Sequence, residues 1–206
     1  MPVRPNMTLA VKRLVRDVAR RIPELGHVRA SRLLVVAGEA RRASRATIRP
    51  ALFGSTRRRR GEGGREKPAI RVKGRRIRYV VTLRPLWFLS STPEERIATI
   101  LHELYHASTR FDGTLHRSRR HSRIPLPDYN RRIRALLDRY LAVAPADVLA
   151  PFSHHGPARA RMWLERPAGF FRDPDYRGRR LYTERQLFVG PVQMRTRGRR
   201  RRGAGS

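Results

Sequence analysis

Apolar side chains recur every three or four residues in three stretches of the chain, a spacing that places them on one face of a helix. Polar and charged residues, many of them arginines, separate these apolar positions. The three sets of apolar positions are Leu9, Val11, Leu14, Val15, Val18 and Ile22; Ile97, Ile100, Leu101 and Leu104; and Tyr129, Ile133, Leu136, Leu137, Tyr140 and Leu141. The sequence therefore predicts three amphipathic helices.

Residues typical of helix ends bound the first two of these stretches. Thr8 is the candidate N-cap of the first helix, and Pro23 is expected to end it. Thr92 is the candidate N-cap of the second helix, with Pro93 at the first helical position and Glu95 placed to complete a capping box. We expect the second helix to be the more strongly defined at its start.

Shorter apolar runs between these two helices predict strands. Residues 33–37 are uniformly apolar, and a second strand is predicted at residues 46–49. Residues 69–73 and 76–83 alternate apolar with basic side chains on either side of a Gly-Arg turn, which predicts a hairpin with one buried face. Together these elements predict an α+β fold, in which a small mixed or antiparallel sheet packs against the helices.

Length and composition suggest one folded domain with extensions. A chain of 206 residues with 39% hydrophobic content can bury a single core. We expect a domain over residues 1–142, a C-terminal extension of short strands and loops over residues 143–196, and a disordered Arg-rich tail over residues 197–206. Within the domain, residues 54–67 are rich in Arg, Gly and Glu without periodicity, which predicts a mobile basic loop.

Other compositional features narrow the class of protein. The chain has no cysteine, which excludes disulfide bonds and thiolate metal ligands. It has no apolar run long enough to cross a bilayer and no apolar N-terminal core typical of a signal peptide. We therefore expect a soluble cytoplasmic protein with no membrane partner.

The charge of the chain is strongly positive. Lys and Arg number 48 against 16 acidic residues, which gives a net charge of +32. Codon usage in a GC-rich genome can favour Arg over Lys without a selected function, but the electrostatic field exists whatever its origin. Such a field attracts phosphate backbones through counterion release, so nucleic acid is a candidate partner. The densest basic runs, residues 57–60 and 199–202, lie in segments predicted to be flexible arms.

The second predicted helix carries an HExxH motif. His102 and His106 are four residues apart, so both side chains lie on one helical face and can direct a ring nitrogen at the same Zn²⁺ ion. That face is nearly opposite the apolar stripe, and Glu103 flanks it, where a carboxylate can act as general base toward water. The motif and its capped helix predict a zinc site.

A third ligand is needed, and three residues downstream are candidates. Asp112 has the spacing found in metzincins, but that pattern has a glycine where this chain has Thr109. Residues 111–113, Phe-Asp-Gly, are typical of a turn that would bring the chain back toward the metal. His116 and His121 follow this turn, and a histidine is the simplest third ligand.

The motif and its surroundings resemble a known family. Residues 95–106, the turn at 111–113, the His121-Ser122 dipeptide and the helix led by Tyr129 are similar to a phage and bacterial metallopeptidase family, itself similar to the SprT/Spartan zinc peptidases. The resemblance covers roughly residues 7–142. It implies a zincin-like catalytic domain in which His102, His106 and His121 bind Zn²⁺ and Glu103 is catalytic. The chain departs from the family at residues 122–125, and without cysteine it lacks the zinc-ribbon tail of some SprT-like proteins.

Two functions follow as expectations. The first is a zinc-dependent metallopeptidase that hydrolyses a protein or peptide substrate with Glu103 as general base, and residues 77–83 are nominated as the edge strand that holds the substrate. The second is a basic nucleic-acid-binding protein with a structural or inactive zinc site, which would favour four ligands over three. Tyr105 and Tyr129 are assigned to the core rather than to the site. The sequence does not specify the substrate, the cleavage preference or the oligomeric state.

Overall fold

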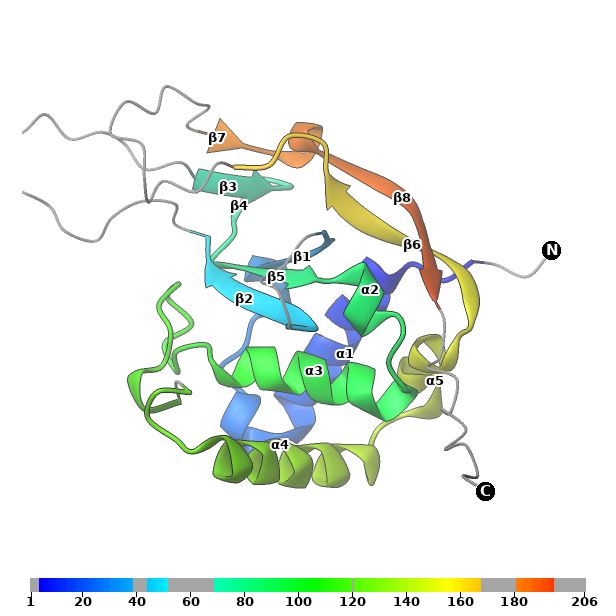
Figure 1. Ribbon diagram of the computed structural model, residues 1–206. Helices are drawn as coiled ribbons and strands as arrows, with labels where there is room; N and C mark the ends of the chain where they lie inside the picture. Colours follow the sequence, from blue (N-terminus) through cyan, green and yellow to red (C-terminus); the bar gives the residue numbers. More distant parts are fainter. Residues whose placement is uncertain (1–3, 39–43, 52–68, 120, 168–180, 195–206) are drawn as a thin grey trace, which may run out of the picture.

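The computed structural model describes residues 4–38, 44–51, 69–119, 121–167 and 181–194. The basic loop predicted at residues 54–67 and the tail predicted at residues 197–206 lie outside the described residues, as does the basic run at 57–60. The fold is mixed α+β, with small sheets packed against helices, as the sequence predicts (Figure 1).

A three-stranded mixed sheet lies at the centre of the molecule. Strand β5 (Tyr79–Leu83) pairs in parallel with β1 (Leu33–Ala37) and antiparallel with β2 (Ala46–Pro50), so the order is β1-β5-β2. Every residue of β1 is buried, because alternate side chains enter two different hydrophobic clusters on the two faces of the sheet. A strand covered on both faces needs an uninterrupted apolar run, and residues 33–37 supply one.

Helices cover one face of this sheet. Helices α1 (Met7–Arg21), α3 (Pro93–Tyr105) and α4 (Leu126–Leu141) lie on the same side, with α3 between the sheet and α4 (Figure 1). The three predicted amphipathic helices are therefore confirmed, although α4 begins three residues before the predicted leading Tyr129. The remaining helical segments are short: α2 (Pro85–Phe88) and α5 (Ala146–Leu149), and 3-10 turns at Pro23–Leu25, Ala30–Arg32, Arg117–Arg119, Ala150–Ser153 and Glu184–Gln186.

The start of α1 differs from the prediction. Asn6, not Thr8, is the N-cap, and its side chain accepts a hydrogen bond from the backbone N–H of Leu9. Thr8 lies inside the helix and is buried, where its hydroxyl accepts a hydrogen bond from the backbone N–H of Arg161 at 2.8 Å. The helix therefore begins two residues earlier than predicted. Leu9, which the sequence places on the apolar face, is 59% exposed.

The strand predicted at residues 76–83 is divided between two sheets. Strand β3 (Ala69–Val72) forms the predicted hairpin with β4 (Arg75–Arg76), through a turn in which Lys73 and Gly74 have φ angles of 51° and 71°. Residues 77 and 78 then leave this hairpin, and β5 enters the central sheet. Strand β7 (Leu181–Tyr182) adds to β3 in parallel, giving the order β4-β3-β7.

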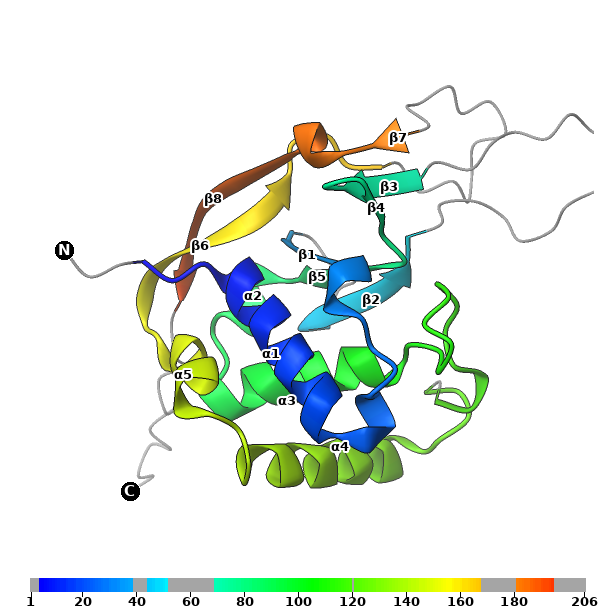
Figure 2. The ribbon, with the colours of Figure 1, turned by 180° about the vertical axis from the view of Figure 1, so that it is seen from behind.

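The residues after 142 contribute to the same core as those before it. Strands β6 (Gly156–Trp163) and β8 (Leu187–Met194) form an antiparallel ribbon beside β1 and α1 (Figure 2). The main hydrophobic cluster includes Phe152, Ala158 and Met194. The buried guanidinium of Arg96, in α3, donates hydrogen bonds to the carbonyl oxygens of Phe152, His154 and Leu89. Among the described residues, no helix is both long and apolar enough to cross a membrane.

Candidate metal centre

The capping box that the sequence predicts fixes the start of α3. The hydroxyl of Thr92 accepts from the backbone N–H of Glu95 at 3.2 Å, and the Glu95 carboxylate accepts from the backbone N–H of Thr92 at 3.0 Å. The apolar stripe of α3 is buried against the sheet and α4. Because that stripe sets the rotation of the helix, His102 and His106 emerge together from its other side.

The last turn of α3 is tighter than an ordinary α-helical turn. The backbone N–H of His106 donates to the carbonyl of Glu103 at 3.2 Å instead of that of His102. The hydroxyl of Tyr129, on α4, donates instead to the carbonyl oxygen of His102 at 3.2 Å. This contact satisfies a backbone acceptor at the helix end and links α4 to the turn that carries both histidines.

The chain reverses directly after α3, as the turn at residues 111–113 predicts. Phe111 and Gly113 have φ angles of 48° and 98°, and a bridge joins Ala107 to Leu115. The Asp112 carboxylate accepts hydrogen bonds from the Thr114 backbone N–H at 2.9 Å and from the hydroxyls of Thr114 and Ser108. The reversal brings the following residues back past the end of the helix.

Three histidines meet at this end of α3. The Nε2 atom of His121 lies 3.2 Å from Nε2 of His102 and 3.2 Å from Nε2 of His106. Zinc–nitrogen bonds of 2.0–2.1 Å in a tetrahedral arrangement place two ligand nitrogens about 3.3 Å apart, so the residues fit an ion of this size. His102 and His106 are half-buried and His121 is exposed, so the site is open to solvent on the His121 side.

A hydrogen bond to a backbone carbonyl orients the ring of His106. Nδ1 of His106 lies 2.8 Å from the carbonyl oxygen of Arg119. Because a carbonyl can only accept, Nδ1 carries the proton and the lone pair of Nε2 points at the histidine cluster. The guanidinium of Arg119 lies 4.2 Å from the centre of the Tyr105 ring, which fixes the segment that supplies this carbonyl.

The electrostatics of the site keep two of its imidazoles neutral. Burial, together with the neighbouring histidines, lowers the pKa of His102 to about 3. Burial also lowers the pKa of His106 to about 4, against the opposing effect of its hydrogen bond to Arg119. A neutral imidazole is the form that binds a metal, so both rings are ready for a ligand role well below neutral pH.

Glu103 follows His102 in α3, and its side chain is buried. Its side chain accepts a hydrogen bond from the backbone N–H of Ile48 at 2.6 Å, and the residue is 7% exposed. Burial raises the pKa of the carboxyl group to about 7, although the Ile48 hydrogen bond acts in the opposite direction. A carboxyl group with a pKa near the working pH can both accept and return a proton.

The strand beside the site is β2, not the nominated residues 77–83. Strand β5, which contains most of that segment, is paired on both sides and has no free edge for a peptide. Strand β2 is at the edge of the sheet, and the Ile48 N–H on its outer side points to Glu103. The nomination is wrong because the sequence pattern does not reveal which strand lies at the edge.

Asp112 and His116, the other two candidates for the third ligand, make hydrogen bonds within the turn and loop that follow α3. Among the described residues, the cluster that could hold a metal ion comprises His102, His106 and His121. Asp112 is held in the turn by Ser108 and Thr114, whose hydrogen bonds keep the pKa of its carboxyl group well below its usual value. His116 contributes its backbone N–H to the carbonyl of His106 at 2.8 Å, and its ring contacts Ser118.

Tyr129 lies closer to the site than the sequence indicates. It is fully buried, as a core residue should be, but its ring centre lies 4.7–5.3 Å from the ring centres of His102, His106 and His121. The helical stripe that contains Tyr129 is visible in the sequence, whereas the register of α4 against α3 is not. Tyr129 therefore forms a wall of the histidine cluster.

Comparisons of the chain with protein-family models, with curated proteins and with solved structures give no match. The resemblance to SprT-like peptidases stays a prediction.

Proposed function

We propose that the protein is a zinc-dependent metallopeptidase with a zincin-like catalytic fold. One observation carries the proposal: the Nε2 atoms of His102 and His106 each lie 3.2 Å from Nε2 of His121, and the residue after His102 is a buried glutamate whose pKa is raised to about 7. A set of three protein ligands leaves a coordination position open, which is typical of catalytic rather than structural zinc. His102, His106 and His121 would hold the ion.

Glu103 is the proposed general base. When bound, zinc would lower the pKa of water and polarise the scissile carbonyl. Glu103 accepts the proton from the attacking water and passes it to the departing amine, and a pKa near 7 suits both transfers. The Ile48 N–H holds the carboxylate on the side of the site next to β2.

The outer edge of β2 is the proposed support for the substrate. The Ile48 N–H lies on the side of the strand that faces away from β5, toward Glu103. A peptide that adds to this edge would lie alongside Glu103, with its backbone held by main-chain hydrogen bonds. Such binding recognises an extended backbone, so an unfolded protein is the appropriate first substrate.

The competing function is a nucleic-acid-binding protein with structural zinc. Structural sites are usually closed by four ligands. The described histidine cluster contains three, and one of them, His121, is exposed to solvent. These features favour the enzyme.

The test compares zinc-loaded wild-type protein with Glu103→Gln, using an unfolded casein and a quenched fluorescent peptide mixture. General-base catalysis contributes about 10²- to 10⁴-fold, so the variant should lose at least that factor in rate while it keeps its zinc. Glu94→Gln, an exposed position on the first turn of the same helix, is the matched control and should cleave normally. Equal rates for wild type and Glu103→Gln would refute the role of Glu103.

A further inference from the structure

Three elements that are distant in the sequence bring cationic side chains to one surface. Helix α1 supplies Lys12 and Arg16, the β3–β4 turn supplies Lys73 and Arg75, and β6 supplies Arg161. We call these five residues the basic surface. The backbone N–H of Arg161 donates to the Thr8 hydroxyl at 2.8 Å, which fixes β6 against α1.

The positive charges of the basic surface act on one another. Lys12 is half-buried, and burial followed by the charges of Arg161, Arg16, Arg75 and Lys73 lowers the pKa of its amine. Among the described residues, Glu184 is an acidic neighbour of this set: it accepts a hydrogen bond from the backbone N–H of Lys73 at 3.2 Å, and the charges of Lys73 and Arg161 act on it.

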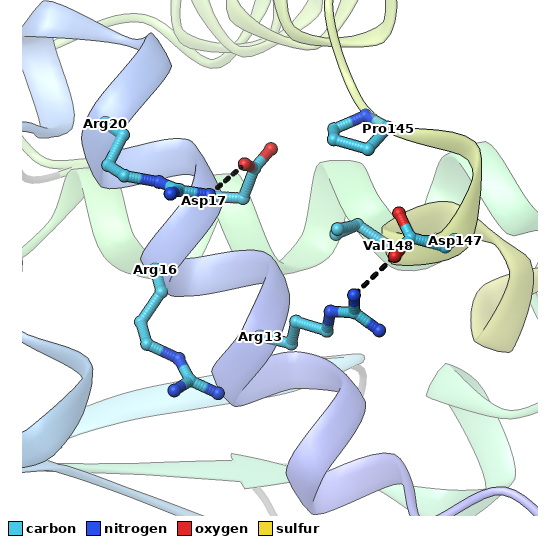
Figure 3. Close-up of a pocket in the computed structure, with 7 residues that line it drawn as sticks. All are labelled: Arg13, Arg16, Asp17, Arg20, Pro145, Asp147 and Val148. Carbon is cyan, nitrogen blue, oxygen red and sulfur yellow. Dashed lines mark hydrogen bonds and ion pairs between the residues drawn. The ribbon is translucent and has the colours of Figure 1, made fainter.

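Two neighbouring arginines of α1, Arg13 and Arg20, differ from the basic surface because each forms an ion pair with an aspartate. A hollow of about 570 Å³ between α1 and α5 contains Arg13 paired with Asp147 and Arg20 paired with Asp17 (Figure 3). Arg16 borders this hollow, and its guanidinium turns away from Asp147 (Figure 3). Among the described residues, none of the five basic-surface side chains forms an ion pair with a carboxylate. The same helix therefore has one set of cations that is neutralised and one that is not.

We propose that the basic surface binds the phosphodiester backbone of a nucleic acid. Five cations on three elements held together by the fold match a row of phosphates better than they match a single anion. The negative charges of a polyanion would offset the repulsion among these cations. Binding would also release counterions condensed on the nucleic acid, which favours association at low salt. DNA and RNA share this chemistry.

The basic surface is separate from the candidate metal centre. It lies on the β1 side of the central sheet, where β6 packs beside β1 and α1. The metal centre adjoins β2 at the other edge, through Glu103 and Ile48. Changes in the basic surface should therefore alter nucleic-acid binding without altering zinc content, so this inference does not depend on the proposed peptidase activity.

The experiment measures binding of the full chain to a fluorescein-labelled DNA duplex, and to an RNA duplex of the same sequence, over a range of salt concentrations. The test variant removes three cations of the basic surface, Arg16→Gln, Arg75→Gln and Arg161→Gln. Each lost phosphate contact reduces the slope of log K against log salt by about 0.9 and weakens binding roughly eightfold at 0.1 M salt relative to 1 M. The triple variant should bind on the order of 500-fold more weakly at 0.1 M salt.

A matched variant separates position from net charge. It removes three exposed arginines of α4, a helix that contributes no residue to the basic surface: Arg131→Gln, Arg132→Gln and Arg134→Gln. This control should keep nearly the wild-type affinity and salt slope. Equal weakening by the two triple variants would show that net charge alone drives binding and would overturn the proposal. The proposal would also be overturned if the basic-surface variant lost binding to phosphatidylserine vesicles but bound both duplexes as tightly as the wild type.

Discussion

Replacement of Glu103 by Gln should stabilise the metal-free protein, although it removes the proposed general base. The carboxyl group is 7% exposed and accepts from the Ile48 N–H. Gln has nearly the same shape, and its amide oxygen can accept the same hydrogen bond. The substitution therefore removes mainly the cost of holding a negative charge in a buried place.

The magnitude follows from the pKa of this group. Burial raises the pKa from its ordinary value of 4.5 to about 7 in the folded protein. The folded state therefore binds this proton more tightly, so stability is lost as the pH rises from about 4.5 to about 7. A tenfold change in proton affinity corresponds to about 1.4 kcal/mol, so ionised Glu103 costs about 3 kcal/mol above pH 7.

The assay is thermal and urea unfolding of wild type and Glu103→Gln in the presence of a chelator, at pH 8 and at pH 5. For a chain of this size, about 3 kcal/mol corresponds to a rise in Tm of about 6–12 °C at pH 8. The difference should fall to about 1 kcal/mol at pH 5, because the carboxyl group of the unfolded chain is still largely ionised there. Added zinc should also reduce it, because a nearby cation favours the ionised carboxylate. Equal stability of the two proteins at pH 8 without metal, with Glu94→Gln as the control, would refute the reasoning.

Three further changes test the surroundings of the site. His121→Ala should weaken zinc binding by more than the roughly 10- to 100-fold that is typical when a residue outside the ligand set is changed. His116→Ala should still bind one zinc ion per chain. If His116→Ala lost zinc and His121→Ala kept it, His116 would be the third ligand. Tyr129→Phe removes the hydrogen bond to the His102 carbonyl and should cost about 1 kcal/mol in urea unfolding, while an unchanged midpoint would contradict that contact. Thr92→Ala removes the capping box and should also cost about 1 kcal/mol, unless α3 is held by packing alone.

Local sequence signals predicted the parts of the site that lie within one element. The Thr92 capping box, the apolar stripe of α3 and the shared face of His102 and His106 all depend on residues a few positions apart. The turn at residues 111–113 likewise returns the chain toward the helix end, as its composition predicts. Such features are decided by backbone geometry and spacing, which a single sequence displays.

The features that were missed depend on contacts between distant segments. Alternation of apolar and basic residues continues from β4 into β5, so nothing in the pattern marks the point at which the chain changes sheets. The hydrogen bond from the Ile48 N–H to Glu103 joins β2 to α3 and depends on which strand is at the edge. Tyr129 reaches the histidines because of how α4 packs on α3, a register that helical periodicity does not determine.

The most direct test of the central claim is X-ray absorption at the zinc edge of the purified protein, with zinc content measured on the same sample. The convergence of His102, His106 and His121 predicts one zinc per chain and three imidazole ligands at about 2.0–2.1 Å. In His121→Ala, the imidazole count of any remaining zinc should fall to two. Absence of zinc after loading, or four imidazoles around it, would contradict an open catalytic site.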